Sequence, residues 1–358
     1  MKSLDDIVSM KTLDPSGVLS STELFPKQCI QAWNESTKII FPKEYADVQN
    51  IVVCGMGGSR FTPKTVKELY RNNIRLPYEI VEDYTLPAYV NDKTLVILST
   101  YSGSTEEVMS CLRDAQVKKA KITAVTQGGT IGDLLTSQHI PAYIFTTTNN
   151  PCGQPRIGSG YMLFGHIGIL VSLGFLALDA DSVITSIENG SKMASTYRGA
   201  VLEKSNQAKQ LARKFDKKHI IVVTAEFLRG FGNGFANQLN ETAKTMSDYR
   251  YIPELNHHLM EGLSYPEDFR KHALFVFFTS DLYSEQIRKR IDISMDVLDK
   301  QQIASLSIQL TGTNPLETIV EAYSLSGFVT FYMAMLNSVD PVAIPWVNYF
   351  KQQLARGA

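Results

Sequence analysis

The feature that most restricts the fold of this 358-residue chain is a repeated alternation of short apolar runs with helical segments. The first series of apolar runs lies at residues 51–54, 78–81, 94–98, 121–125 and 142–145. Such runs are typical of strands buried on both faces, and their alternation with helices favours a parallel sheet covered on both sides. The order restarts with runs at 219–224, 273–278 and 303–310, which predicts two similar α/β domains.

The remaining segments predict the domain boundaries. We expect an N-terminal helical segment over 1–42, a first domain over 43–195, a second domain over 196–340 and a C-terminal tail over 341–358. Apolar periodicity further predicts helices in and between the domains. These helices are expected over 161–178, 197–218, 235–246 and 318–336, with a turn at Gly230-Phe231-Gly232 before the third.

Composition excludes several classes of protein. The net charge is −1 and no basic run occurs, so no nucleic-acid partner is expected. Residues 1–17 lack the apolar core of a signal peptide, and the apolar stretch at 161–178 is interrupted by His166 and glycines, so no membrane span is expected. The four cysteines form no CxxC pair and are predicted to be reduced and mostly buried, as in a cytoplasmic protein; they are Cys29, Cys54, Cys111 and Cys152.

The first candidate binding loop is Gly55-Met56-Gly57-Gly58-Ser59, directly after the first apolar run. Ligands of open α/β sheets bind at the carboxyl ends of strands, where this loop lies. A dinucleotide fingerprint needs a glycine where Arg60 stands, so the motif fails even though Glu82 occupies a suitable position for a ribose-binding acid. A tight turn without any ligand remains the plain alternative.

The second loop, 99–107, runs from an apolar strand into a helix and is rich in hydroxyls. These hydroxyl groups are carried by Thr100, Tyr101, Ser102, Ser104 and Thr105. Helix capping needs only one of them, and capping is the alternative interpretation. Hydroxyl and backbone N–H donors at a helix N-terminus are suited to bind a phosphate monoester. No P-loop lysine is present, so a nucleoside triphosphate is not expected.

These two loops resemble the first sugar-isomerase (SIS) domain of the bifunctional phosphoglucose/phosphomannose isomerases. The resemblance continues in the same order along nearly the whole chain, through Gln154-Pro155-Arg156, Asn240-Glu241, Asn256-His257, Asp340-Pro341 and Lys351. It implies two SIS-type domains, each a parallel sheet flanked by helices in a Rossmann-like three-layer sandwich. The implied reaction interconverts fructose 6-phosphate with glucose 6-phosphate, and with mannose 6-phosphate as a further product, through a cis-enediolate and without a metal or other cofactor.

The resemblance also implies a role for each site residue. The phosphate of the sugar is expected on the loops, at Gly57, Gly58, Ser59, Thr100, Ser102 and Thr105. Arg156 is expected to stabilise the enediolate, and Glu241 to be the base that moves the proton between C2 and C1. His257, from the partner subunit of a homodimer with a shared active site, is expected to assist ring opening, with the C-terminal tail bringing Lys351 close to the sugar.

The chemistry explains why these residue types are needed. Isomerisation removes a weakly acidic proton next to a carbonyl, which needs a positioned base. The enediolate needs a cation that does not titrate, which favours arginine. Opening the sugar ring moves protons near neutral pH, which suits histidine.

Taken singly, each residue has an ordinary alternative. Glu241 is on a helix and points away from its apolar stripe, as a solvated glutamate does; Arg156 and Lys351 have the surroundings of surface cations. His257 and Glu261 have the i, i+4 spacing of a metal pair, but no HExxH motif is present. Only the joint occurrence of these residues predicts a catalytic site.

The chain departs from the family pattern at several positions. Arg60 and Phe61 are larger than usual and would either narrow the pocket or add a charge to the phosphate site; Thr100 replaces a serine and His258 an asparagine. Two further functions stay open: a non-catalytic SIS module that senses a phosphosugar, and an isomerase of a shorter or amino sugar phosphate.

Overall fold

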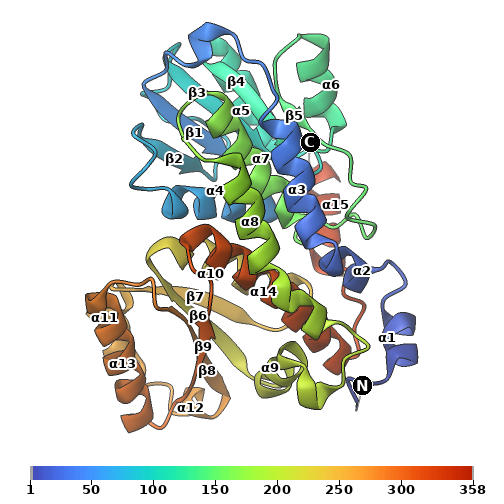
Figure 1. Ribbon diagram of the computed structural model, residues 1–358, viewed down its shortest axis with the longest axis vertical. Coiled ribbons are helices and arrows are strands. Elements are labelled where there is room, and N and C mark those ends of the chain that lie inside the picture. Colours follow the sequence, from blue (N-terminus) through green and yellow to red (C-terminus); the bar gives the residue numbers. More distant parts are fainter. Residues whose placement is uncertain (1–2, 357–358) are drawn as a thin grey trace.

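The first sheet forms the upper half of the molecule in Figure 1. The structure is a computed structural model that describes residues 3–356. All strands of this sheet are parallel and follow the order β2-β1-β3-β4-β5. Its strands are β1 (Asn50–Cys54), β2 (Tyr78–Val81), β3 (Thr94–Ser99), β4 (Lys121–Thr126) and β5 (Tyr143–Ile144). The predicted apolar runs are therefore confirmed as strands of one buried parallel sheet.

The second sheet, in the lower half of Figure 1, repeats this topology with one strand fewer. It is parallel, in the order β7-β6-β8-β9. Its strands are β6 (His219–Ala225), β7 (Ser247–Ile252), β8 (Ala273–Ser280) and β9 (Ala304–Leu310). Strand β7 was not predicted, because this edge strand has the polar sequence SDYRYI and only its two end residues are buried.

Helices cover both faces of the first sheet, as predicted. On one face, Val52, Val96 and Leu98 pack with the apolar residues of α5 (Glu106–Val117) and α6 (Gly129–Ser137). On the other face, Ile51, Val53 and Ile97 join the main core with α3 (Phe25–Ser36), α4 (Gly58–Leu69) and α7 (Ser159–Ser172). The chain begins with two shorter helices, α1 (Ile7–Leu13) and α2 (Val18–Glu23).

The remaining helices surround the second sheet and connect it to the first (Figure 1). They are α8 (Ala180–Gly190), α9 (Gln207–Phe215), α10 (Arg229–Glu241), α11 (Leu255–Gly262), α12 (Phe269–His272), α13 (Glu285–Lys300), α14 (Pro315–Leu336) and α15 (Pro345–Arg356). Short 3₁₀ turns lie at η1 (Lys43–Tyr45), η2 (Lys192–Tyr197), η3 (Glu203–Ser205) and η4 (Glu226–Leu228). In the described part of the chain, α14 alone is long and apolar enough to span a membrane, but 94% of its apolar window is buried inside the protein.

Three helix predictions need correction. The helix expected over 161–178 ends at Ser172, because Gly174 adopts a left-handed φ of 74° that ends the helix. The helix expected over 197–218 is shorter, because Asn206 caps α9 by accepting a hydrogen bond from the backbone of Lys209. The helix expected to end at Met246 stops at Glu241.

The expected turn at 230–232 is also wrong, since these residues belong to α10. Its glycines are contact points rather than turn residues. A Cβ atom on Gly230 would lie 2.3 Å from the backbone nitrogen of Thr65, and one on Gly234 would lie 2.7 Å from the ring of Phe61. Glycine thus lets α10 of the second half pack directly on α4 of the first half.

Candidate active site

The two candidate loops lie side by side at the edge of the first sheet where the strand order reverses. The first loop follows β1 and the second follows β3, and these are neighbouring strands on opposite sides of the reversal. The backbone N–H of Tyr101 donates to Oγ of Ser59 at 2.9 Å, and Oγ of Ser99 donates to the carbonyl of Ser59 at 2.5 Å. The predicted loops therefore form one continuous polar surface at a position where such sheets bind ligands.

The second loop is held by internal hydrogen bonds and exposes two of its serine side chains to solvent. Thr100 is fully buried; its hydroxyl accepts from the backbone N–H of Gly103 at 3.2 Å and pairs with the hydroxyl of Thr105 at 2.9 Å. Thr105 is the N-cap residue of α5 but makes no side-chain cap hydrogen bond. Ser102 and Ser104 are exposed. The start of α5 thus presents its N–H groups to an anion, with the exposed hydroxyls of Ser102 and Ser104 beside them.

Arg156 is held in a cage between the two halves of the molecule. Its side chain is only 2% exposed, yet all five of its N–H groups have acceptors, which matches the donor capacity of a guanidinium. The acceptors are Oγ1 of Thr242 (3.0 Å), Oε1 of Gln154 (2.9 Å), Oε2 of Glu241 (3.4 Å) and the carbonyls of Pro341 (2.7 Å) and Val342 (3.0 Å). Burial lowers the pKa of Arg156, and the neighbouring Glu241 carboxylate opposes that change.

Glu241 is the most loosely held member of this cage. It lies at the C-terminal end of α10, its side chain is 34% exposed, and its contact with Arg156 is the longest of the set. It lines a cavity of about 480 Å³ together with Asp340 and Trp346. The carboxylate is thus beside a fixed positive charge and open to solvent, so a ligand can replace water there without breaking the cage.

The phosphate loops and the Arg156–Glu241 pair are adjacent. A Cβ atom on Gly58 would lie 3.5 Å from the backbone nitrogen of Arg156, and Gln238 of α10 donates to the carbonyl of Arg156 at 2.9 Å. Asn150 links the same segment to the second loop, since it donates to the hydroxyl of Tyr101 at 2.7 Å. The structure therefore brings Gly57, Gly58, Ser59, Thr100, Ser102, Thr105, Arg156 and Glu241 into one region.

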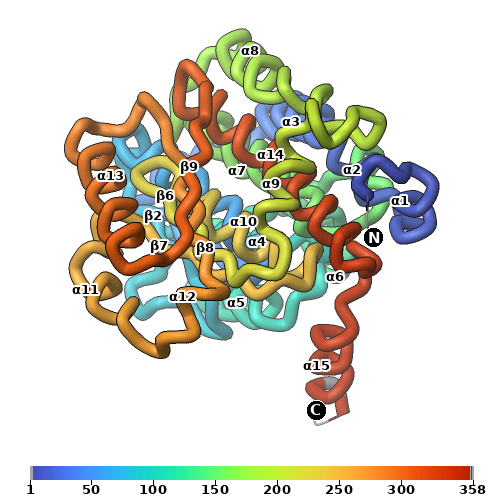
Figure 2. Tube along the Cα trace, turned by 90° about the horizontal axis from the view of Figure 1, so that it is seen from below, coloured from blue at the N-terminus to red at the C-terminus, as the bar shows by residue number. Residues whose placement is uncertain are grey.

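The structure does not bring His257 and Lys351 to this region within one chain. His257 is exposed on α11, which packs on β7 and α13 at the far left of Figure 1. Lys351 is exposed on α15, which extends away from the body of the molecule in Figure 2. Both roles stay predictions that depend on a second chain or on movement of the tail. Within residues 3–356, no group of three or more His, Cys, Asp or Glu residues is placed to bind a metal. His257 and Glu261, which have the spacing of a metal pair, are therefore not part of such a group.

The two bulky residues after the first loop do not fill the pocket. The guanidinium of Arg60 bonds the carboxylate of Glu82 and donates to Oδ1 of Asn233 at 2.6 Å. Phe61 is fully buried and stacks on Tyr323 with ring centroids 6.2 Å apart. Arg60 and Phe61 therefore hold α4 against α10 and α14, which is an interdomain role.

Sequence reasoning missed several partners of the site. Thr242, Gln154 and the carbonyls of 341–342 hold Arg156. The resemblance included Gln154 and Pro341 without giving them this role, and the signal for Thr242 was its position next to Glu241. Lys244 also lines the cavity beside Glu241, and its ammonium donates to the carbonyl of Asp340 at 2.6 Å. Partial burial and then the charge of Arg156 lower the pKa of Lys244 to about 8.

The fold and this site define a class: tandem SIS domains of the kind found in sugar-phosphate isomerases. Residues 204–354 match the family described as the bacterial phospho-glucose isomerase C-terminal SIS domain. A curated bifunctional phosphoglucose/phosphomannose isomerase of Caldicellulosiruptor bescii is 30% identical over 336 residues, covering 92% of this chain and 96% of that protein. The chain belongs to the bifunctional phosphoglucose/phosphomannose isomerase family.

Solved structures share the fold at much lower identity. A hypothetical protein of Thermus thermophilus superposes with a TM-score of 0.75 at 13% identity, covering 98% of this chain and 93% of that one. Tagatose-6-phosphate ketose/aldose isomerase of Escherichia coli superposes with a TM-score of 0.71 at 12% identity, covering 93% of this chain and 98% of that one. At this identity the likeness concerns the fold alone.

Proposed function

We propose that this protein interconverts fructose 6-phosphate with glucose 6-phosphate and mannose 6-phosphate by proton transfer between C1 and C2. The observation that carries the proposal is the pairing of a buried arginine with a solvent-accessible glutamate beside an open phosphate-type loop. The names of the curated relatives, which are bifunctional phosphoglucose/phosphomannose isomerases, supply the choice of sugars.

The phosphate of the substrate would bind at the start of α5. Ser59, Ser102 and Thr105 would donate to its oxygens together with the N–H groups of the helix, and the helix dipole would favour its negative charge. Thr100 is buried, so in this proposal its main contribution is to hold the loop open by bonding Gly103 and Thr105. Gly57 and Gly58 let the phosphate approach the backbone closely.

Glu241 would remove the proton from C2 and return it to C1. Its carboxylate lies next to Arg156, and the long 3.4 Å contact means that one guanidinium N–H is weakly engaged. That N–H is available to the oxygen on which negative charge develops in the enediolate, while the other four keep the guanidinium in place. A fixed positive charge at this position would stabilise the intermediate without a metal.

We place the protein in the cytoplasm as a homodimer, with His257 of one chain completing the active site of the other. Two observations support a second copy. His257 is exposed and distant from its own site, and α15 exposes large apolar side chains, with Trp346 82% and Phe350 60% exposed. An exposed apolar helix favours burial against another chain. A partner on this face would also fix the position of Lys351.

The test is an NMR time course of the protein with fructose 6-phosphate in deuterated buffer that contains EDTA. The spectra monitor the exchange of hydrogen for deuterium on the sugar. The wild-type protein should produce aldose 6-phosphates with deuterium at C2. Glu241→Gln keeps the shape of the side chain but removes the base, so turnover should fall by about 10²- to 10⁴-fold while phosphosugar binding persists. Glu188→Gln, an exposed residue on α8, is the matched control and should retain full activity.

The same variants test the shared site. When Glu241→Gln and His257→Ala chains are mixed, half of the sites in each mixed dimer carry neither change, so activity should return. Activity of Glu241→Gln alone near that of the wild type would remove Glu241 from the base role. Binding of the phosphosugar by the wild type without exchange at C2 would favour a sensor over an isomerase.

A further inference from the structure

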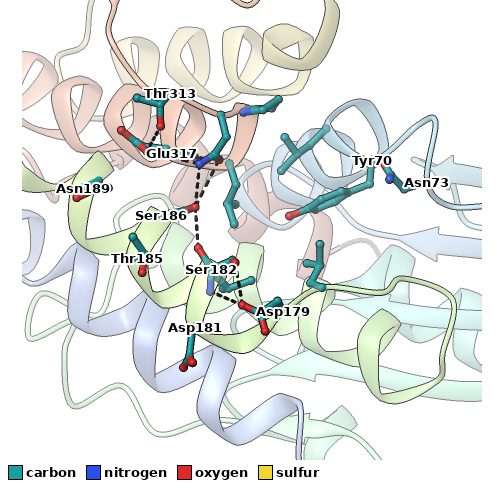
Figure 3. Close-up of a pocket in the computed structure, with 16 residues that line it drawn as sticks. Tyr70, Asn73, Asp179, Asp181, Ser182, Thr185, Ser186, Asn189, Thr313 and Glu317 are labelled. Atoms are coloured by element: carbon teal, nitrogen blue, oxygen red, sulfur yellow. Dashed lines mark hydrogen bonds between the residues drawn. The ribbon is translucent and has the colours of Figure 1, made fainter.

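A second cavity lies at the C-terminal end of α4, whereas the phosphate loops lie at its N-terminal end. It is formed where α4 ends, along α8, and where α14 begins (Figure 3). Its volume is about 630 Å³, which is within the range of small-molecule binding sites. Since α4 begins at Gly58 in the first loop and spans 12 residues, its two ends are separated by about 18 Å. The cavity is therefore a separate site.

The lining of this cavity mixes apolar and polar side chains, and its charged groups are all negative. Carboxylates are contributed by Asp179, Asp181 and Glu317, and none of its lining residues, all within the described part of the chain, is Lys, Arg or His. Among the charged side chains here, a phosphorylated sugar would meet only like charge. The remaining polar groups are hydroxyls and amides, which bond to hydroxyl and amino groups of a ligand.

The hydroxyl group of Tyr70, a residue that lines this cavity, lacks a hydrogen-bond partner among the described residues. The side chain of Tyr70 is 6% exposed. In Figure 3 the Tyr70 ring extends from the end of α4 and directs its oxygen toward α8 and the start of α14. Burial raises the pKa of Tyr70, so the hydroxyl stays protonated and able to donate. A buried polar group without a partner is costly and rare, which favours a ligand that supplies one.

The opposite wall is rigid and already arranged. Glu317 is 8% exposed in the first turn of α14, and its Oε2 accepts from the hydroxyl of Thr313 at 2.8 Å. Asn314 caps the same helix by accepting from the backbone of Glu317 at 3.0 Å, and donates to Oγ of Ser186 on α8 at 3.1 Å. These bonds, drawn in Figure 3, hold the carboxylate in place before any ligand arrives. A prearranged carboxylate in a cavity without positively charged side chains is suited to an ammonium group.

We propose that this cavity binds a small polyhydroxylated amine without a phosphate group, with its ammonium beside Glu317 and a hydroxyl bonded to Tyr70. The carboxylates provide the charge selection and the hydroxyl and amide groups provide the polar contacts. This site is independent of the proposed isomerisation, because none of its residues belongs to the phosphate loops or to the Arg156 cage.

Calorimetric titration of the full-length protein with glucosamine in slightly acidic buffer tests the proposal, with glucose as the uncharged comparison. Glucosamine should bind saturably at millimolar concentration and more tightly than glucose, and saturating inorganic phosphate should not displace it. Absence of saturable binding, equal binding of glucose, or displacement by phosphate would each overturn the proposal.

Two variants locate the site. Tyr70→Phe should weaken glucosamine binding about fivefold through loss of one hydrogen bond. Its thermal midpoint without ligand should be equal to or above that of the wild type, since the removed hydroxyl has no partner. Glu317→Gln should abolish the preference for glucosamine over glucose, whereas Glu188→Gln, an exposed residue elsewhere on α8, should leave binding unchanged. Unchanged glucosamine affinity in both Tyr70→Phe and Glu317→Gln would contradict the assignment.

Discussion

The two sheets of this protein share one strand order, but their loops at the point of strand reversal differ in what occupies them. In the first half, Ser59 and Thr105 surround an open helix start. In the second half, the equivalent position after β6 and β8 is filled by the chain itself: Oε1 of Glu226 accepts from the backbone N–H of Ser284 at 3.2 Å and from its hydroxyl at 2.6 Å. A carboxylate of the protein thus lies where the first half leaves room for the anion of a ligand.

This difference shows that the sheet topology provides a potential anion-binding position at the carboxyl ends of the strands in each half. The side chains of the loops then decide whether that position is open to a ligand. The first half keeps its position open with glycines: Gly103 has a left-handed φ of 71°, and a Cβ atom there would lie 1.7 Å from the carbonyl oxygen of Gly128. The second half has Leu282 and buried Tyr283 in the corresponding loop, and the hydroxyl of Tyr283 accepts from the backbone of Ala225 at 3.1 Å. The open loop needs glycine, whereas the closed loop is packed by the buried ring of Tyr283.

The strongest way to break the contrast is to place a carboxylate in the loop of the first half itself, ahead of Glu106 and Glu107 in the first turn of α5. Ser104→Glu places a negative charge at the exposed start of α5, where it would repel a bound phosphate. Affinity for fructose 6-phosphate should fall about 100-fold, measured by titration calorimetry. The fold should persist, because Ser104 is exposed.

Gln116→Glu is the matched control for this charge. It adds the same charge at the other, exposed end of α5 and should change phosphosugar affinity less than twofold. Equal weakening by both variants would mean that total charge, and not the loop, governs binding. Normal binding by Ser104→Glu would remove the start of α5 from the phosphate site.

A smaller effect is expected from Gly103→Ala, which tests the need for glycine in the open loop. The left-handed backbone and the contact with Gly128 leave no room for a methyl group, so the free energy of unfolding should fall by about 1–3 kcal/mol in urea titration. Gly262→Ala on α11 is the control: no atom lies within 4 Å of the added carbon, so little change is expected. A stable Gly103→Ala protein that binds phosphosugar normally would contradict this account of the loop.

The comparison also explains how far the sequence could predict the structure. The apolar runs that became β1, β3, β6 and β8 were predicted, because buried parallel strands have an unmistakable composition. Strand β7 and the glycines of α10 were not, because an edge strand and a close helix contact depend on neighbours that are distant in the sequence. The expected domain boundaries, including that near residue 195, stay predictions.

The candidate site divides in the same way. The resemblance predicted the identities of Arg156 and Glu241, and the structure places them 3.4 Å apart. It contained no sign that Arg156 would be held by the carbonyls of Pro341 and Val342, since any residue type supplies a carbonyl. The blocking role of Glu226 was likewise invisible, because it arises from a contact with Ser284, 58 positions away.

The smallest expected effect comes from a change in the second half of the molecule, at Glu226. Glu226→Ala removes the carboxylate that occupies the loop after β6, together with its two hydrogen bonds to Ser284. The free energy of unfolding should fall by about 1 kcal/mol in urea titration, and Glu226→Gln, which retains an acceptor, should cost less. Isomerase turnover should stay unchanged in both variants, because the loop after β6 binds no substrate in the proposed function. A loss of fructose 6-phosphate affinity in Glu226→Ala comparable to that of Ser104→Glu would instead mean that both halves bind phosphate. The contrast between an open and a filled loop would then be wrong.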